Sequence, residues 1–166
     1  MNVCLIGNSL TNLVLAKILA NKNIKATIFY EPNRKNKFFS RTIGISKNNY
    51  DFFTDQVLDI QKISWPIKSI KVFNELSLED EILNFGVDNS KLLLIVKYNQ
   101  LFKLLNKDVA NNKYIKKYKI KNSFFYDTIL KNNQFNFIVN SDCENKISKE
   151  IFFKKIKKDY KSTAYT

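Results

Sequence analysis

The sequence predicts a single α/β domain spanning residues 1–166, in which a βαβ unit is followed by an inserted antiparallel β-sheet. In the first 30 residues the hydrophobic spacing changes from that of a strand to that of a helix and back. Between about residues 65 and 96 hydrophobic and polar residues alternate, as in strands with one exposed face. The 166 residues, 45% of them hydrophobic, suffice for one core but are few for two full domains.

The opening segment has the pattern of a βαβ unit. Asn2–Ile6 is a short apolar run typical of a buried strand, and Ser9–Asn21 has apolar residues at helical spacing. Ile24–Tyr30 is β-rich again and stops at Glu31, which precedes a proline. Two strands connected through one helix are expected to be parallel, with a right-handed crossover.

The next segment is expected to hold a short extended piece and a helix. Arg41–Ser46 is a short extended piece, and Lys47–Phe53 has the character of a helix with Ser46 or Asn48 as its cap. Val57–Ile63 is a further amphipathic stretch, and the pattern breaks at Trp65, which precedes a proline.

The remaining elements are predicted from spacing alone. Further strands are expected at Ile67–Asn74, Glu81–Phe85 and Leu92–Val96, which complete the inserted sheet. Helical spacing returns over Tyr98–Val109. Three more strands are expected in the last third of the chain, at Tyr114–Ile120, Phe124–Leu130 and Phe135–Val139.

The net charge of +13 suggests acidic partners: nucleic acid, an anionic membrane surface or a phosphate-bearing ligand. Only Arg34 and Arg41 of the 28 basic residues are arginine, whereas sequence-reading DNA-binding proteins rely on arginine for forked contacts to guanine. The lysines between residues 113 and 121 and between 146 and 161 are therefore interpreted as solvated faces. Nucleic-acid binding is the least favoured of the three functions considered.

Metal chemistry and histidine catalysis are not expected. The chain has no histidine, and the separation of Cys4 and Cys143 matches no metal-binding spacing. Two thiols in a reducing cytoplasm are the simpler interpretation, and a single disulfide is the alternative. Apolar runs such as Leu92–Val96 are too short to cross a membrane, and no signal peptide is visible. No catalytic side chain can be identified.

The turn after the first strand partly matches the phosphate-binding pattern G-x-G-x-x-G of dinucleotide-binding βαβ units. Gly7 occupies the first glycine position, while Ser9 and Asn12 occupy the second and third. Glu31 stands at the end of the second strand, where an acid that binds ribose hydroxyls is expected. The alternative is an ordinary connection, in which Gly7 makes a turn, Ser9 caps a helix and Glu31 is solvated.

The order of the elements resembles that of FAD-dependent aromatic hydroxylases of the p-hydroxybenzoate hydroxylase class, in particular the ubiquinone-biosynthesis hydroxylases. The resemblance covers nearly the whole chain and less than half the length of family members. Five stretches carry it: Asn2–Glu31, Ser40–Phe53, Trp65–Glu75, Leu92–Leu105 and Phe137–Lys149.

The resemblance implies a Rossmann-like FAD-binding unit that is truncated relative to the family. It assigns FAD binding to residues of the loop, the second strand and two later segments: Gly7, Ser9, Asn12, Glu31, Arg41 and Asp142. Arg41 is favoured for a phosphate contact because lysine cannot reproduce the forked geometry of arginine. Cys143 replaces a family glycine, which weakens the expectation that NAD(P)H is used.

The function implied is that of the FAD-binding portion of a flavoprotein monooxygenase that hydroxylates a small aromatic quinone precursor. In such enzymes the flavin performs the oxygen chemistry and the protein orients it. The alternative is a non-catalytic partner subunit or scaffold, eroded at its glycines, that completes another protein chain. Such a scaffold is expected in the cytoplasm or at the periphery of the inner membrane, with its basic faces on anionic lipid.

Overall fold

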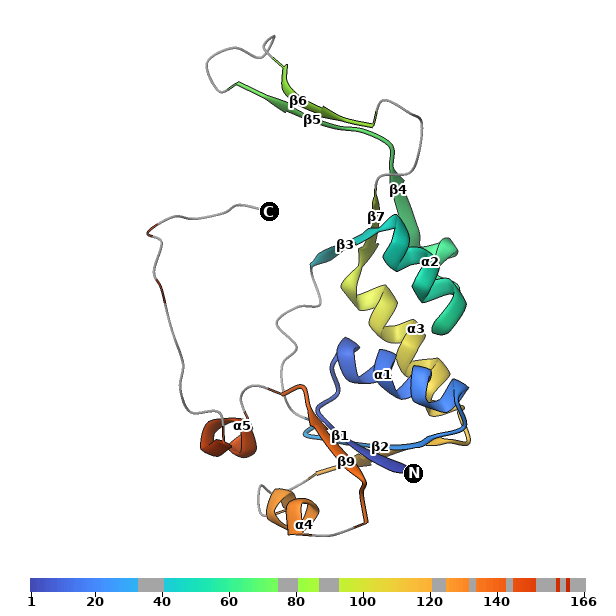
Figure 1. Ribbon diagram of the computed structural model, residues 1–166, viewed down its shortest axis with the longest axis vertical. Helices are drawn as coiled ribbons and strands as arrows, with labels where there is room; N and C mark the ends of the chain where they lie inside the picture. Colours follow the sequence, from blue (N-terminus) through green and yellow to red (C-terminus); the bar gives the residue numbers. More distant parts are fainter. Residues whose placement is uncertain are drawn as a thin grey trace.

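A four-stranded parallel sheet forms one end of the molecule (Figure 1). The computed structural model describes residues 1–32, 41–74, 81–86, 93–120, 125–131, 134–142, 145–151, 158 and 161. The sheet has the strand order β8-β2-β1-β9, and every neighbouring pair is parallel. Its strands are β1 (Asn2–Ile6), β2 (Lys25–Tyr30), β8 (Ile115–Lys119) and β9 (Phe137–Asn140).

Helices cover both faces of this sheet. On one face, α1 (Leu10–Asn21) and α3 (Tyr98–Ala110) pack against a cluster that includes Leu5 and Ile28. On the other face, α4 (Phe125–Lys131) and α5 (Lys146–Ile151) contribute buried side chains to a second cluster with Ile6. Strand residues alternate between the two clusters because successive side chains point to opposite faces.

Cys4 belongs to the second cluster and is fully buried in the centre of β1. Burial raises the pKa of its thiol to about 12, because the charged thiolate would lose its hydration. The Cys4 side chain is therefore a small core residue and does not take part in chemistry at neutral pH.

The antiparallel part follows the opening βαβ unit, as predicted. Its three-stranded sheet has the order β3-β7-β4, formed by β3 (Thr42–Ser46), β4 (Ser64–Ile67) and β7 (Leu93–Lys97). The inner face of this sheet carries Ile45 and Val96, which join the same core cluster as Leu5. Helix α2 (Lys47–Gln56) packs beside this sheet, with the short 3-10 helix η1 (Gln61–Ile63) between α2 and β4.

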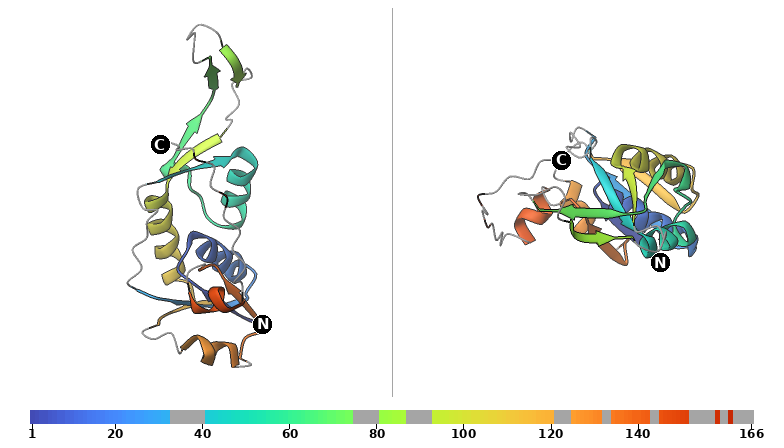
Figure 2. Two further views of the ribbon diagram at one scale, coloured as in Figure 1. Left: turned by 90° about the vertical axis from the view of Figure 1, so that its left-hand side faces the viewer. Right: turned by 90° about the horizontal axis from the view of Figure 1, so that it is seen from above.

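Strands β5 (Ile70–Phe73) and β6 (Glu81–Phe85) form a separate two-stranded antiparallel ribbon. The ribbon projects from the three-stranded sheet at the end of the molecule opposite the parallel sheet (Figures 1 and 2). None of the helices in the described residues is long and apolar enough to cross a membrane.

Two predictions about individual elements need correction. The strand expected at Phe124–Leu130 is wrong, because residues 125–131 form α4. Its buried residues Tyr126 and Ile129 are three positions apart, which is helical spacing. The expected strand Ile67–Asn74 is divided between the end of β4 and β5. The amphipathic stretch Val57–Ile63 ends in the 3-10 helix η1.

Candidate functional site

The loop between β1 and α1 lies at the carboxyl edge of the parallel sheet, and Gly7 begins it. Gly7 has a φ of +103°, a backbone conformation that favours glycine. Its N–H donates to the Phe29 carbonyl at 2.8 Å. A Cβ atom at Gly7 would lie 3.1 Å from both Asp142 Cβ and Ser141 Oγ. A glycine is therefore required both by the turn and by the close approach of the segment after β9.

Ser9 caps α1 and connects the loop to that segment. Its Oγ accepts a hydrogen bond from the Asn12 N–H at 3.2 Å and lies 2.6 Å from Ser141 Oγ. The Ser141 N–H in turn donates to the Ile6 carbonyl at 3.0 Å. These bonds fix the two segments at the sheet edge relative to each other.

Asn12 lies beneath the loop and is fully buried. Its Nδ2 donates to the carbonyls of Ile6 and Gly7, at 2.8 Å in each case. Asn12 Oδ1 has no hydrogen-bond partner within the described part of the chain. The side chain thus occupies the position of the third motif glycine and holds the turn from below.

The first turn of α1 leaves two backbone donors free for a ligand. Asn12 donates to Ser9 Oγ and Leu13 donates to the Ser9 carbonyl at 3.0 Å. The N–H groups of Leu10 and Thr11 have no acceptor among the residues that the structure describes. No acidic side chain lies in this turn. Free N–H groups at the positive end of a helix favour an anion such as phosphate.

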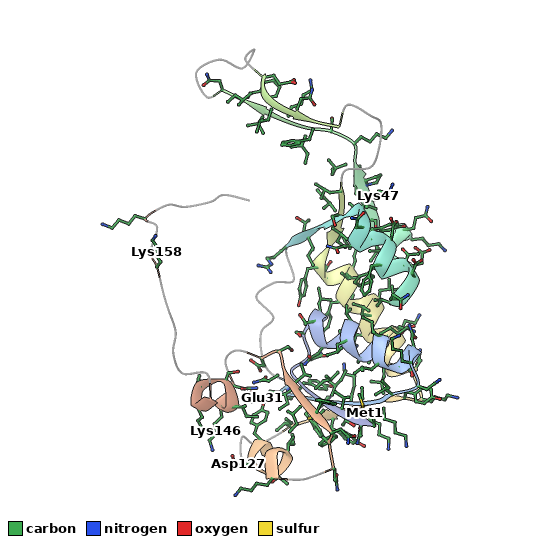
Figure 3. All side chains as sticks on the ribbon, in the orientation of Figure 1. Met1, Glu31, Lys47, Asp127, Lys146 and Lys158 are labelled. Atoms are coloured by element: carbon green, nitrogen blue, oxygen red, sulfur yellow. The ribbon has the colours of Figure 1, made fainter. Side chains whose placement is uncertain are left out.

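Glu31 follows β2, the strand next to β1, at the same edge of the sheet. Its Oε1 accepts a hydrogen bond from the Tyr126 hydroxyl at 2.9 Å. Tyr126 is buried beneath the sheet, so the core holds the carboxylate in place. Figure 3 shows Glu31 beside the parallel sheet, near Asp127 and Lys146 and far from Lys47 at the start of α2.

Asp142 lies in a turn that side-chain amides hold in shape. Its N–H donates to Asn140 Oδ1 at 3.0 Å, and its carbonyl accepts from Ser148 Oγ at 2.6 Å. Asn145 is buried, caps α5 through the Ser148 N–H and donates to Asn140 Oδ1 at 2.8 Å. This network places Asp142 beside Gly7. Cys143 lies outside the described residues.

Arg41 lies apart from the other predicted residues. It is exposed and immediately precedes β3 of the antiparallel sheet, and its carbonyl accepts from the Tyr98 N–H at the start of α3 at 2.9 Å. The structure thus brings Gly7, Ser9, Glu31 and Asp142 to one edge of the parallel sheet and places Arg41 immediately before β3 of the antiparallel sheet.

Lys117 is a part of this region that the sequence did not reveal. Its Nζ donates to Asn8 Oδ1 in the loop at 2.9 Å and to Asn106 Oδ1 in α3, and it lies 5.0 Å from the centre of the Tyr30 ring. Burial lowers its pKa to about 8. By its sequence context alone, Lys117 counts among the solvated lysines. The alternation of side chains along β8 places Lys117 on the same face as the buried Ile115, which argues against a fully solvated position.

The residues at this edge fit the adenosine diphosphate part of a dinucleotide. The left-handed Gly7 turn and the free N–H groups of Leu10 and Thr11 suit a pyrophosphate. The Glu31 carboxylate can accept hydrogen bonds from ribose hydroxyls. Asn12 departs from the motif, and its buried side chain donates to the carbonyls of Ile6 and Gly7.

No protein-family model and no curated protein matches the sequence. Solved structures do share its fold. PqsL from Pseudomonas aeruginosa, a probable FAD-dependent monooxygenase, aligns with a TM-score of 0.57 and 12% identity over 72% of this chain and 32% of its own. p-Nitrophenol 4-monooxygenase PnpA from Pseudomonas putida aligns with a TM-score of 0.56 and 10% identity over 70% and 31%.

A third similar structure contains the cofactor. Klebsiella pneumoniae HpxO, complexed with FAD and uric acid, aligns with a TM-score of 0.55 and 14% identity over 70% of this chain and 30% of its own. The chain therefore spans about a third of the length of these proteins. At these identities the shared property is the fold: the chain has the mixed α/β fold of one part of FAD-dependent monooxygenases.

Proposed function

We propose that this chain binds FAD at the loop after β1, as the FAD-binding portion of a flavoprotein monooxygenase that hydroxylates an aromatic quinone precursor. The main support for the proposal is that three features lie at the same edge of two adjacent parallel strands. They are the Gly7 turn, the free N–H groups at the start of α1 and the Glu31 carboxylate. The fold shared with FAD-dependent monooxygenases supports it.

Each residue has a stated task in this proposal. The N–H groups of Leu10 and Thr11 bind the pyrophosphate, and Gly7 lets the backbone approach it. Glu31 binds the ribose of the adenosine half, with Tyr126 holding its carboxylate in place. The family resemblance assigns Arg41 to the pyrophosphate or ribityl chain and Asp142 to the pyrophosphate side of the flavin, whereas Asn12 shapes the loop.

The bound flavin supplies the oxygen chemistry of such an enzyme. The described side chains of this edge bind and orient the cofactor. The aromatic substrate class rests on the family resemblance and on similar structures whose names include p-nitrophenol and uric acid.

The direct test is to titrate the purified chain with FAD and follow quenching of flavin fluorescence. We expect saturable binding that Gly7→Ala and Glu31→Gln each weaken at least about tenfold. Glu31→Gln removes one well-placed charged hydrogen bond, and Gly7→Ala adds a Cβ that distorts the loop. Glu150→Gln is the matched control, because Glu150 is an exposed acid on α5. An absence of binding at high micromolar FAD contradicts the proposal.

Competition identifies which half of FAD occupies the site. ADP is expected to displace FAD because the assigned groups recognise pyrophosphate and ribose, whereas FMN is expected to compete poorly. Equal competition by FMN would place the main contacts elsewhere. A change in the flavin spectrum on adding p-hydroxybenzoate to the loaded protein would then support an aromatic substrate.

A further inference from the structure

Lys117 places a half-buried cation beside the Gly7 loop. Its Nζ donates to Asn8 Oδ1 at 2.9 Å and to Asn106 Oδ1, and it lies 5.0 Å from the centre of the Tyr30 ring. These three groups come from the loop, from α3 and from β2, and all of them are neutral. Each presents its negative side to the cation, so together they stabilise an ammonium group at this position.

No carboxylate pairs with this cation among the residues that the structure describes. Glu31 follows β2, but its carboxylate is bound to Tyr126 of the cluster on the other face of the sheet. The other charged groups on the elements around Lys117 are exposed or paired with each other: Lys25, Lys103, Lys107, Lys116, Lys119 and the Lys17–Asp108 ion pair. A half-buried charge among neutral groups becomes more favourable when an anion binds beside it.

Lys117 also determines the orientation of the Asn8 amide. Asn8 directly follows Gly7 in the loop. An ammonium group has no acceptor, so only the amide oxygen of Asn8 can face it. The NH₂ group of Asn8 is therefore turned away from Lys117, and it has no acceptor in the described part of the chain. This group adds a side-chain donor to the free backbone donors of Leu10 and Thr11 at the same loop.

We propose that Lys117 is a positioning residue of the FAD site: its ammonium group fixes the Asn8 amide so that the Asn8 NH₂ donates to the pyrophosphate, and its charge favours that anion. The inference rests on the proposed function, which places the pyrophosphate at the Gly7 loop. It adds two residues to the site, because Asn8 occupies a position that the G-x-G-x-x-G motif leaves open and Lys117 lies far beyond the motif.

The proposal couples FAD binding to the protonation of Lys117. Burial lowers the pKa of the free chain's Lys117 to about 8, so the ammonium form prevails at neutral pH. A bound anion stabilises that form and raises the pKa again, which means that the neutral amine binds FAD more weakly. The affinity for FAD should therefore be highest below about pH 8 and fall as the amine loses its proton. The charge of the pyrophosphate does not change over this range.

Titration of the full chain with FAD at several pH values tests this coupling. We expect the affinity to fall at least about fivefold between about pH 7 and pH 9.5. Calorimetric titration in two buffers of different ionisation enthalpy should show an uptake of about 0.4 proton per FAD near pH 8. A lysine that only packs in the fold would produce neither result, and neither measurement requires a substitution.

Substitution of the lysine separates its charge from the general charge of the strand. Lys117→Met should bind FAD about tenfold more weakly than the natural chain at neutral pH and lose the pH dependence of binding. Lys116→Met is the matched control, because Lys116 is an exposed lysine on the same strand. This variant should keep both the affinity and its pH dependence.

Asn8→Asp tests the amide. The new carboxylate can still accept from Lys117, but it presents an oxygen where Asn8 has its NH₂ group, so FAD binding should weaken at least about tenfold. Asn48→Asp makes the same change of charge at an exposed position in α2 and should alter the affinity less than about twofold.

The outcomes distinguish this inference from the proposed function. FAD binding with a constant affinity over the same pH range, or without proton uptake, would overturn the role of Lys117 and leave the FAD site standing. Equal losses in Lys117→Met and Lys116→Met, or in Asn8→Asp and Asn48→Asp, would show that only the overall charge matters and would also overturn it. A natural chain that binds no FAD would refute the proposed function, and this inference with it.

Discussion

The hydroxyl oxygens of Ser9 and Ser141 lie 2.6 Å apart although 132 positions separate them in the sequence. Ser9 caps the helix that follows the Gly7 turn, and Ser141 follows the last strand of the parallel sheet. The shape of the loop therefore depends on a strand added late in the chain. Removal of β9 is expected to alter the loop even though β1, α1 and β2 are contiguous.

A double-mutant cycle measures this connection. Ser141→Ala removes the connection together with the 3.4 Å hydrogen bond from its hydroxyl to the Ile6 carbonyl. Ser9→Ala removes the connection and the helix cap, and the cap is worth about 1 kcal/mol in the free energy of unfolding. We expect a coupling between the two sites of about 0.5–1.5 kcal/mol in urea unfolding. Additive effects would show that the two hydroxyls do not interact.

Gly7→Ala tests the backbone requirement of the turn. The new Cβ would contact Asp142 Cβ and Ser141 Oγ, and the left-handed backbone would be strained. We expect a loss of stability of about 1–3 kcal/mol together with the loss of FAD affinity stated above. Gly44→Ala is the control, because its new Cβ meets only the flexible end of Leu93 and its backbone is not left-handed. Equal losses in both variants would contradict this assignment.

Lys117 is expected to make stability depend on pH. Its folded pKa is about 8, below the ordinary 10.5, because burial disfavours the charged amine. Between these two values the unfolded chain binds more protons than the folded chain, so stability should rise as the pH increases. The penalty is fully present below about pH 8, and its removal is worth about 1–3 kcal/mol.

Urea unfolding at several pH values between 7 and 10.5 measures the effect. Lys117→Met should remove this part of the pH dependence, and Lys116→Met should leave it in place because Lys116 is exposed on the same strand. An identical slope in all three proteins would mean that Lys117 is solvated.

Tyr126→Phe separates the packing of Tyr126 from its hydrogen bond. The ring remains in the core, while Glu31 Oε1 loses the donor that lies at 2.9 Å. We expect a loss of stability of about 0.5–1.5 kcal/mol and weaker FAD binding by a few-fold, measured by the same fluorescence titration. Tyr118→Phe serves as control because the Tyr118 side chain is about half exposed, at 47%. Unchanged FAD affinity in Tyr126→Phe would show that Glu31 needs no support.

The parts that the sequence predicted well are those governed by local pattern. The βαβ unit follows from apolar spacing within 30 residues, and the position of Glu31 follows from the end of β2. The segment containing Tyr126 was misjudged because its aromatic, β-branched composition favours a strand, whereas packing under the sheet selected a helix.

Long-range contacts could not be predicted from the sequence. Nothing local shows that Ser141 reaches Ser9, or that Lys117 lies against Asn8, because both depend on strand order. Asn12 could be aligned with a motif position, but only the structure shows its amide bound to two carbonyls below the loop. The predicted roles in FAD binding stay predictions for all six residues: Gly7, Ser9, Asn12, Glu31, Arg41 and Asp142.

The burial of Cys4 gives this protein an internal reporter of its own opening. A thiol sealed inside the central strand is alkylated only in molecules whose sheet has come apart. In a Cys143→Ser background, the labelling rate of Cys4 therefore measures how often the parallel sheet opens. Slower labelling in the presence of FAD would measure how strongly the ligand holds the sheet closed, without any spectroscopic signal from the flavin.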